Sequence, residues 1–284
     1  MPCGTSCSST TDRPSKRPGD RRWPPLDRDR LTALASAVWP PAATFAALLA
    51  MLEIASGAGW LPITVPPPSA VIAEFGTSGA DLLYHVWPSI LATVAGFAIS
   101  ALVAAGFAAV GASWRRAGGP VFTLGVLVDS TPLIAVAPIL VAFIGGGMTL
   151  HVVVAAVACF FSILMGMMKG FRAVDRNSDE LFHVLAASRW QRLVKLALPS
   201  ALPFVFAGFK IAAPLAVLGT LIAEWMGAER GVGIMMIYAM FSFDPPQVWM
   251  TIVAVCLMAI GGYSLFAVAE RAFLGWADRD EGRL

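Results

Sequence analysis

The sequence predicts an all-α, polytopic membrane protein, and three observations carry this prediction. Of the 284 residues, 57% are hydrophobic and only 13% are charged, whereas soluble domains have about 45–50% apolar and about 25% charged residues. The mean hydropathy is +0.73. Long stretches carry no charge, and they cover residues 31–52, 86–114, 130–168 and 245–269. Because a bilayer core of about 30 Å needs about 20 apolar helical residues, each stretch can span it.

Six transmembrane helices are expected. The uncharged run 130–168 cannot be a single helix because Gly145-Gly146-Gly147 interrupts it. The first helix contains Trp39-Pro40-Pro41, which predicts a kink there. The six helices are expected over residues 32–53, 86–112, 120–144, 149–168, 199–224 and 246–270. We therefore expect a disordered tail over 1–30, a first transmembrane helix within 31–60, a transmembrane domain over 61–275 and a second tail over 276–284.

The distribution of Lys and Arg predicts the orientation in the membrane. The first tail holds seven of them, the segment between the fourth and fifth helices holds six, and the segment after the sixth helix holds three. Arg115 and Arg116 lie between the second and third helices, whereas the alternate loops hold only Arg230. Since cytoplasmic loops are enriched in Lys and Arg, both termini are expected in the cytoplasm.

Two of the loops expected on the outer side have the pattern of ordered structure. Residues 61–75 read LPITVPPPSAVIAEF, which predicts a proline-stiffened turn and then a short helix. Residues 227–244 read GAERGVGIMMIYAMFSFD, which predicts a short apolar helix after a glycine-rich turn.

One charged, amphipathic stretch, DELFHVLAASRWQRLVKLALP over residues 179–199, separates two apolar segments. Two helix starts are expected in and just before it: Asn177 can cap one helix with Glu180 three residues later, and Ser188 can cap a second with Gln191. A corner near Ala186-Ala187 would join the two helices.

The first of these helices would present an apolar surface, made of Leu181, Phe182, Val184 and Leu185. Such a surface on a cytoplasmic corner fits docking into a groove of another protein. The alternative is an amphipathic helix that lies in the membrane surface.

This stretch resembles the cytoplasmic motif of the permeases of binding-protein-dependent ABC importers. That motif reads Glu-Ala-Ala, three residues, Gly, nine residues, an aliphatic residue, any residue and Leu-Pro. Glu180, Leu196 and Leu198-Pro199 match it in register. Leu181 and Phe182 replace the two alanines, and Ala186 replaces the glycine, where a positive φ would strain an alanine.

The resemblance covers roughly residues 60–275. VPPPSAVIAEF (65–75), STPLIAVAPILVAFIGGG (130–147), ASRWQ (187–191) and IAEWMGAERGVG (222–233) are similar to the branch that imports nitrate, sulfonates, taurine, thiamine-precursor pyrimidines and riboflavin. It implies an ABC importer permease over 61–275, in a bacterial plasma membrane, that imports a small solute such as nitrate, a sulfonate, taurine or a pyrimidine-type compound.

The resemblance also implies partners and coupling residues. The partners would be P-loop ATPase subunits, an extracytoplasmic substrate-binding protein, a second permease copy in a homodimer and the lipid bilayer, with no cofactor and no nucleic acid. The residues that would couple the permease to the ATPase are Glu180, Leu181, Phe182, Leu185, Ala186, Ser188 and Arg189.

Ionisable residues inside membrane spans are costly and suggest function. Asp129, Lys210 and Glu224 are candidates for the translocation path. Counted from the ends of their predicted helices, Asp129 and Lys210 lie near the bilayer midplane, and we expect them to pair. Glu224 can alternatively be a solvated helix end. The glycines Gly96, Gly106, Gly208 and Gly219 are more typical of close helix packing than of substrate contact.

Other function classes find little support in the sequence. It contains no G-x-x-x-x-G-K-[ST] motif, so ATP hydrolysis is expected on a partner. We expect a transport subunit and not an enzyme, because no catalytic or metal-ligand cluster is visible. An ion-gradient-driven secondary transporter is the alternative, but such a transporter has no reason to carry the coupling motif.

Overall fold

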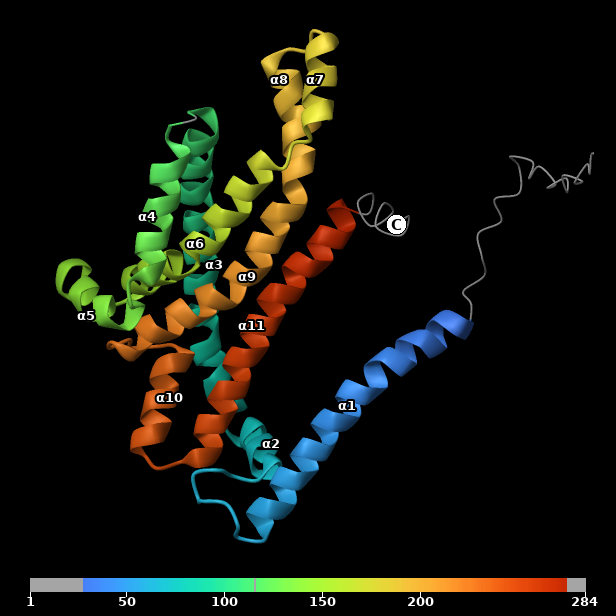
Figure 1. Ribbon diagram of the computed structural model, residues 1–284. Coiled ribbons are helices and arrows are strands. Elements are labelled where there is room, and N and C mark those ends of the chain that lie inside the picture. The colour runs from blue at the N-terminus through green and yellow to red at the C-terminus, as the bar shows by residue number, and fades with distance from the viewer. Residues whose placement is uncertain (1–27, 115, 275–284) are drawn as a thin grey trace, which may run out of the picture. The chain divides into compact units, whose positions relative to one another are not determined.

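The protein is helical throughout, with no strand, over the residues that the computed structural model describes, 28–114 and 116–274 (Figure 1). Its contacts divide the chain into two compact units between Leu52 and Glu53. Of the tail predicted for residues 1–30, residues 1–27 lie outside the described residues, and residues 28–30 belong to helix α1. The tail predicted for 276–284 lies wholly outside them.

Helix α1 (Arg28–Gly57) carries the first predicted span. Its residues 39–57 are apolar enough to cross a membrane. The helix continues through Pro40 and Pro41, so the proline pair does not end it. Membrane helices tolerate proline in this way because other groups can satisfy the freed backbone carbonyls.

The second unit holds the remaining helices and one π-helical turn, η1. They are α2 (Pro68–Thr77), α3 (Gly79–Ser113), α4 (Gly118–Ser130), α5 (Leu133–Ile144), α6 (Met148–Arg172), α7 (Arg176–Val184), α8 (Arg189–Arg192), η1 (Leu193–Ala197), α9 (Leu198–Trp225), α10 (Val232–Phe241) and α11 (Pro245–Phe273). In the described part of the chain, five helices are long and apolar enough to span a membrane, and α4 with α5 makes a sixth if the bent pair is counted as one span. The predicted all-α, multi-pass class is confirmed.

The third predicted span, 120–144, is wrong as a single helix. It is broken into α4 and α5, whose axes are bent by 91°. The break follows from Thr131-Pro132: proline drives the residue before it out of the helical region, and Thr131 has ψ 120° while Pro132 has ψ 107°. The predicted break at Gly145–Gly147 is confirmed, since Gly145 and Gly147 have φ of +83° and +99°.

The α6–α9 pair forms the centre of the second unit, and glycines let the two backbones approach. A Cβ atom on Gly166 would lie 2.7 Å from the Phe204 carbonyl oxygen, and one on Gly208 would lie 2.9 Å from that of Ser162. Close packing is likewise confirmed at Gly96 and Gly219, whose added Cβ atoms would each lie 2.6 Å from an alanine Cβ. The expectation is wrong for Gly106, which has nothing within 4 Å.

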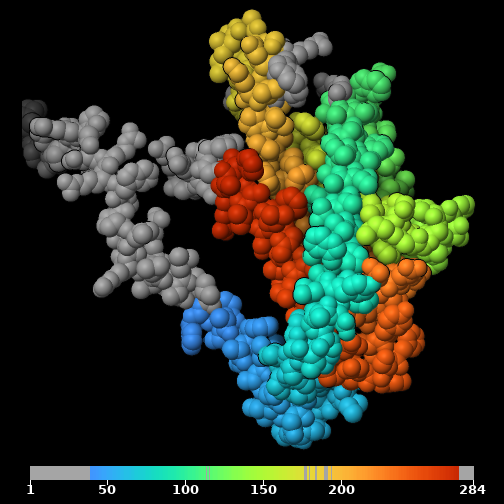
Figure 2. All heavy atoms as spheres, turned by 180° about the vertical axis from the view of Figure 1, so that it is seen from behind, coloured from blue at the N-terminus to red at the C-terminus, as the bar shows by residue number. Residues whose placement is uncertain are grey.

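Helix α3 runs along one face of the second unit, with α5 projecting beside it (Figure 2). Several of its large apolar side chains are exposed, among them Leu91, Val94, Leu102 and Val103. A continuous exposed apolar surface is typical of a membrane-facing helix.

The two predicted short helices are both present. Helix α2 begins at Pro68. Proline suits this position because the N–H of the first helical residue has no acceptor within the helix. Helix α10 begins after Gly231, which has φ +150°. Both helices lie at one end of the second unit, and α7 and α8 lie at the opposite end (Figure 1).

Candidate functional site

The corner between α7 and α8 begins with a capped helix. The Asp175 carboxylate accepts hydrogen bonds from the backbone N–H and the hydroxyl of Ser178, both at 3.2 Å. Helix α7 therefore begins at Arg176. The prediction that Asn177 caps this helix is wrong. Asp175 is the cap, because its carboxylate accepts from the Ser178 N–H three residues later, which the first turn of the helix leaves unpaired.

The second predicted cap is confirmed. The Ser188 N–H donates to Gln191 Oε1 at 2.9 Å, and the Gln191 N–H donates to Ser188 Oγ at 3.2 Å. This reciprocal pair satisfies two backbone donors that a helix start leaves unpaired. Helix α8 continues through η1 into α9. The cap at Ser188 therefore sets where this continuous helical segment begins after the corner.

Ala186 forms the corner itself, as predicted, with φ +50°. The Ala187 N–H donates to the Phe182 carbonyl at 3.0 Å across the turn. Ala186 thus adopts the left-handed conformation that glycine takes without strain. For a residue with a side chain, this conformation costs roughly 1–2 kcal/mol. The departure from the family's glycine changes the strain at the corner but not its left-handed conformation.

The corner presents uncovered apolar side chains. Leu181 is 56% exposed, Val184 83% and Leu185 66%. We call these three residues the corner surface. Phe182 is half-buried beside them, and Glu180 and Ser188 are exposed. The side chain of Arg189 lies outside the described residues.

Glu224, at the far end of α9, is not a solvated helix end. It is 1% exposed. The Ser89 hydroxyl donates to its Oε1 at 2.5 Å, and the Gly233 N–H donates to its Oε2 at 2.7 Å. The carboxylate therefore joins α9 to α3 and to the first turn of α10.

Two more side chain–backbone bonds complete this cluster. The Val232 N–H donates to Ser89 Oγ at 3.0 Å, and the Gly231 N–H donates to His85 Nδ1 at 3.1 Å. A helix start leaves such N–H groups unpaired and favours a negative charge beside them. We call His85, Ser89, Glu224 and the backbone of 231–233 the Glu224 clamp.

Gly231 is required for the Glu224 clamp to close. A Cβ atom at this position would lie 2.3–2.6 Å from the Glu224 carboxylate atoms. Its φ of +150° is also rare for any residue with a side chain. The glycine-rich turn before α10 thus allows the carboxylate and the backbone to meet.

Lys210 pairs with Glu270 rather than with Asp129. Its Nζ lies 2.6 Å from Glu270 Oε2, and the two side chains are 21% and 25% exposed. Asp129 is exposed at the end of α4, and nothing in residues 28–114 and 116–274 joins it to Lys210. The expected Asp129–Lys210 pair is therefore absent from this structure. Glu270 lies three residues before α11 ends, whereas Lys210 lies near the middle of α9, so the ion pair joins the end of one helix to the middle of the other.

Aromatic rings flank this ion pair along the α9–α11 contact. Phe206 stacks on Phe273 with ring centroids 6.2 Å apart, and Phe209 packs on Phe266 at 5.3 Å. Glu270 lies between Phe266 and Phe273 in sequence, and Lys210 directly follows Phe209. The ion pair is therefore part of a helix–helix contact.

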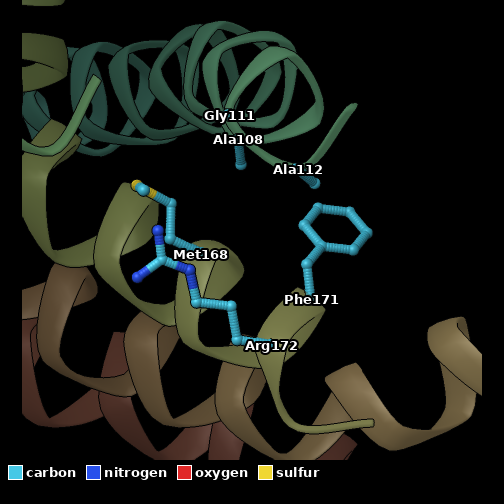
Figure 3. A pocket seen from close by; sticks show the side chains of 6 residues that line it. All are labelled: Ala108, Gly111, Ala112, Met168, Phe171 and Arg172. Carbon is cyan, nitrogen blue, oxygen red and sulfur yellow. The ribbon is translucent and has the colours of Figure 1, made fainter. Parts of the chain in front are cut away.

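A cavity of about 240 Å³ lies between the C-terminal ends of α3 and α6 (Figure 3). Ala108, Gly111 and Ala112 line it from α3, and Met168, Phe171 and Arg172 from α6. The Arg172 side chain extends back toward Met168 (Figure 3). A basic residue in the last turn of a helix is favourable without any ligand, which accounts for Arg172.

Sequence reasoning missed the partners that decide these sites. Glu270 directly follows the last uncharged run, at the end of its predicted helix, so depth along the helices gave no signal that it pairs with Lys210. Ser89 and His85 gave no local signal, because they lie 135 and 146 residues before their partners.

The apolar spanning helices define a multi-pass membrane protein, and a capped corner projects at one end of its second unit. The chain belongs to the family of binding-protein-dependent transport system inner membrane components, whose sequence profile matches residues 96–273. It is therefore a permease subunit of an ABC transporter, as the resemblance indicated.

Three relatives show the branch. The formylaminopyrimidine transport permease protein ThiX of Halalkalibacterium halodurans is 30% identical over 83% of this chain and 95% of its own length. The protein named putative aliphatic sulfonates transport permease protein SsuC, of Bacillus subtilis, is 25% identical over 94% of this chain and 93% of its own length. The riboflavin transport system permease protein RibX of Chloroflexus aurantiacus is 30% identical over 52% and 55%. These are the kinds of permease that the sequence resembles.

Proposed function

We propose that two copies of this permease form the membrane part of an ABC importer in a bacterial plasma membrane. Two P-loop ATPase subunits would hydrolyse ATP on the cytoplasmic side, and a substrate-binding protein would deliver the solute outside. Both termini and the α7–α8 corner would lie in the cytoplasm. The first helix within residues 31–60 would be an addition to the permease domain over 61–275.

The corner surface is the observation that carries this proposal. Leu181, Val184 and Leu185 are exposed on a corner whose two helices both begin with a capping hydrogen bond. Burying each such side chain would contribute about 1.5–3 kcal/mol. Glu180, Phe182, Ala186, Ser188 and Arg189 would complete the contact with the ATPase. A rigid corner suits this role because ATP-driven movement must reach α9 without being lost in a loose loop.

The cargo would be a small solute, and nitrate, a sulfonate, taurine or a pyrimidine-type compound are the candidates. The names of the relatives, which include a formylaminopyrimidine and an aliphatic sulfonate permease, support this range. Asp129, exposed beside the α4–α5 bend, is proposed to face the path. Lys210 and Glu224 would affect the path indirectly: Lys210 positions α11 through Glu270, and Glu224 positions α10 through the Gly233 N–H.

The substitution Leu185→Asp tests the docking surface. It places a charge on the corner surface, and we expect the ATPase to stop co-purifying while the permease still inserts and unfolds at the same temperature. Ile63→Asp is the matched control, because Ile63 is 90% exposed at the opposite end. Co-purification and transport by the Leu185→Asp variant at the control's level would refute docking at this corner, and transport without any ATPase would favour a secondary transporter.

A further inference from the structure

A second cavity lies where two loops meet near the Glu224 clamp. It has a volume of about 530 Å³. Pro88 of α3 forms one wall, the α5–α6 loop and the start of α6 form another, and the α9–α10 loop forms the third. The residues that line it are Pro88, Gly146, Gly147, Met148, His151, Gly227, Glu229 and Arg230. We call it the loop cavity.

His151 is a buried polar side chain without a partner. It is 5% exposed, it lines the loop cavity, and its Nε2 atom makes no hydrogen bond in the described structure. Buried polar atoms are nearly always paired, and each exception needs an explanation. A ligand with a polar group in the loop cavity would supply the missing partner.

The start of α6 adds backbone donors to the same wall. Gly147 precedes this 25-residue helix and offers no side-chain cap. The first N–H bonded within the helix is that of His151, to the Gly147 carbonyl at 3.3 Å. The N–H groups of Met148, Thr149 and Leu150 therefore have no acceptor within the helix, and such a helix start attracts anions.

Arg230 brings a full positive charge to the cavity from the opposite loop. Its guanidinium lies 4.6 Å from the centroid of the Tyr84 ring, a cation–π contact that restrains it. Glu229 lines the same cavity and is exposed. The Arg230 guanidinium can balance one negative charge on a ligand, and the Glu229 carboxylate disfavours a second.

We propose that the loop cavity binds a small molecule with one oxyanionic group, a sulfonate or a carboxylate. Its oxygen atoms would accept hydrogen bonds from the first turn of α6 and from His151 Nε2, and Arg230 would balance the charge. This site rests on the proposed function and extends it, because the solute would have a binding site within the permease itself.

The three histidines of the chain provide a direct test. In the assembled transporter, with only the permease isotope-labelled at histidine, solid-state NMR separates His85, His151 and His183 after assignment by single substitution. The probe is methanesulfonate up to about 100 mM, since a small ligand with few contacts binds weakly. Dimethyl sulfone, uncharged and of similar size, is the matched control compound.

We expect methanesulfonate to shift the imidazole signals of His151 saturably, while His183 stays unchanged and dimethyl sulfone has no effect. Arg230→Gln should weaken this binding roughly threefold to tenfold, whereas Arg116→Gln at the other end should not. A His151 signal that never moves, or that moves equally with both compounds, would overturn the site. Because the measurement needs no ATP and no transport, its failure leaves the docking experiment on Leu185 unaffected.

Discussion

Both ends of the second unit expose apolar side chains, but only the α10 end is held by buried polar side chains among the described residues. At the α7–α8 end, Leu181, Val184 and Leu185 are exposed although they are apolar. At the α10 end, Ser89 and Glu224 are buried although they are polar, at 2% and 1% exposure. The first arrangement is unfavourable for an isolated chain in water, whereas the second is favourable only if every polar atom finds a partner.

The difference predicts where a substitution acts on the permease alone. The Glu224 clamp is complete within the chain, because its carboxylate and its hydroxyl are bonded to α3, α9 and α10. The corner surface is held in place by caps but covered by nothing in the described residues. We therefore expect substitutions in the Glu224 clamp to change the stability of the permease alone, and substitutions in the corner surface to change its assembly.

Gly231→Ala is expected to have the largest effect on stability. The added methyl group would lie within 2.6 Å of the Glu224 carboxylate, so the Glu224 clamp must open and leave buried groups unpaired. Overpacking and unpaired groups together predict a loss of roughly 3 kcal/mol or more. Thermal unfolding of the purified permease in detergent measures the loss.

Gly227→Ala is the matched control for that change. Gly227 also has a positive φ, +112°, but nothing lies within 4 Å of an added Cβ atom. It should lose only the backbone strain, roughly 1–2 kcal/mol. Equal losses from both substitutions would show that the clamp contributes nothing. Loss of ATPase docking in a folded Gly231→Ala variant would break the contrast between the two ends.

The Lys210–Glu270 pair lies between these ends, and its removal is expected to have an intermediate effect. Lys210→Met leaves a half-buried carboxylate unpaired, which predicts a loss of about 1–3 kcal/mol. Lys210→Met combined with Glu270→Leu should recover most of it, because replacing both partners is often neutral. A double-mutant cycle on thermal unfolding measures the coupling between the two residues.

Asp129→Asn is the control for the pair, since Asp129 is exposed. It should leave the unfolding temperature unchanged. If Asp129→Asn destabilises the permease as much as Lys210→Met, the Asp129–Lys210 pair expected from sequence would regain support over the pair in this structure.

Local signals predicted much of the fold and of the corner. Uncharged runs located the spanning helices, and the S-x-x-Q spacing located the cap of α8, because both depend on neighbours in sequence. The bend at Thr131-Pro132 also follows from neighbours in sequence, because proline restricts the residue before it.

Contacts between distant helices could not be predicted in the same way. Ser89 is an ordinary residue within an apolar run, and only the fold brings it to a carboxylate 135 residues later. For Lys210, depth estimated from predicted helix ends favoured Asp129. In the structure, the last helix continues three residues beyond its predicted end, to Phe273, and Glu270 near that end lies beside Lys210.

Ala186→Gly is expected to have the smallest effect, and it tests how finely the corner surface is set. Ala186 has φ +50°, where glycine is free of the strain that a Cβ causes. Glycine also gains freedom in the unfolded chain, which offsets about 0.4–1 kcal/mol of that relief. The net stabilisation should therefore be below about 1 kcal/mol, with unchanged binding of the ATPase. Thermal unfolding and titration of the ATPase onto the permease measure the two quantities. Ala187→Gly, one residue further along, is the control and should only destabilise. If Ala186→Gly instead weakens ATPase binding, the strained alanine itself must fix the angle between α7 and α8. The corner would then depend on strain as the Glu224 clamp depends on close contact.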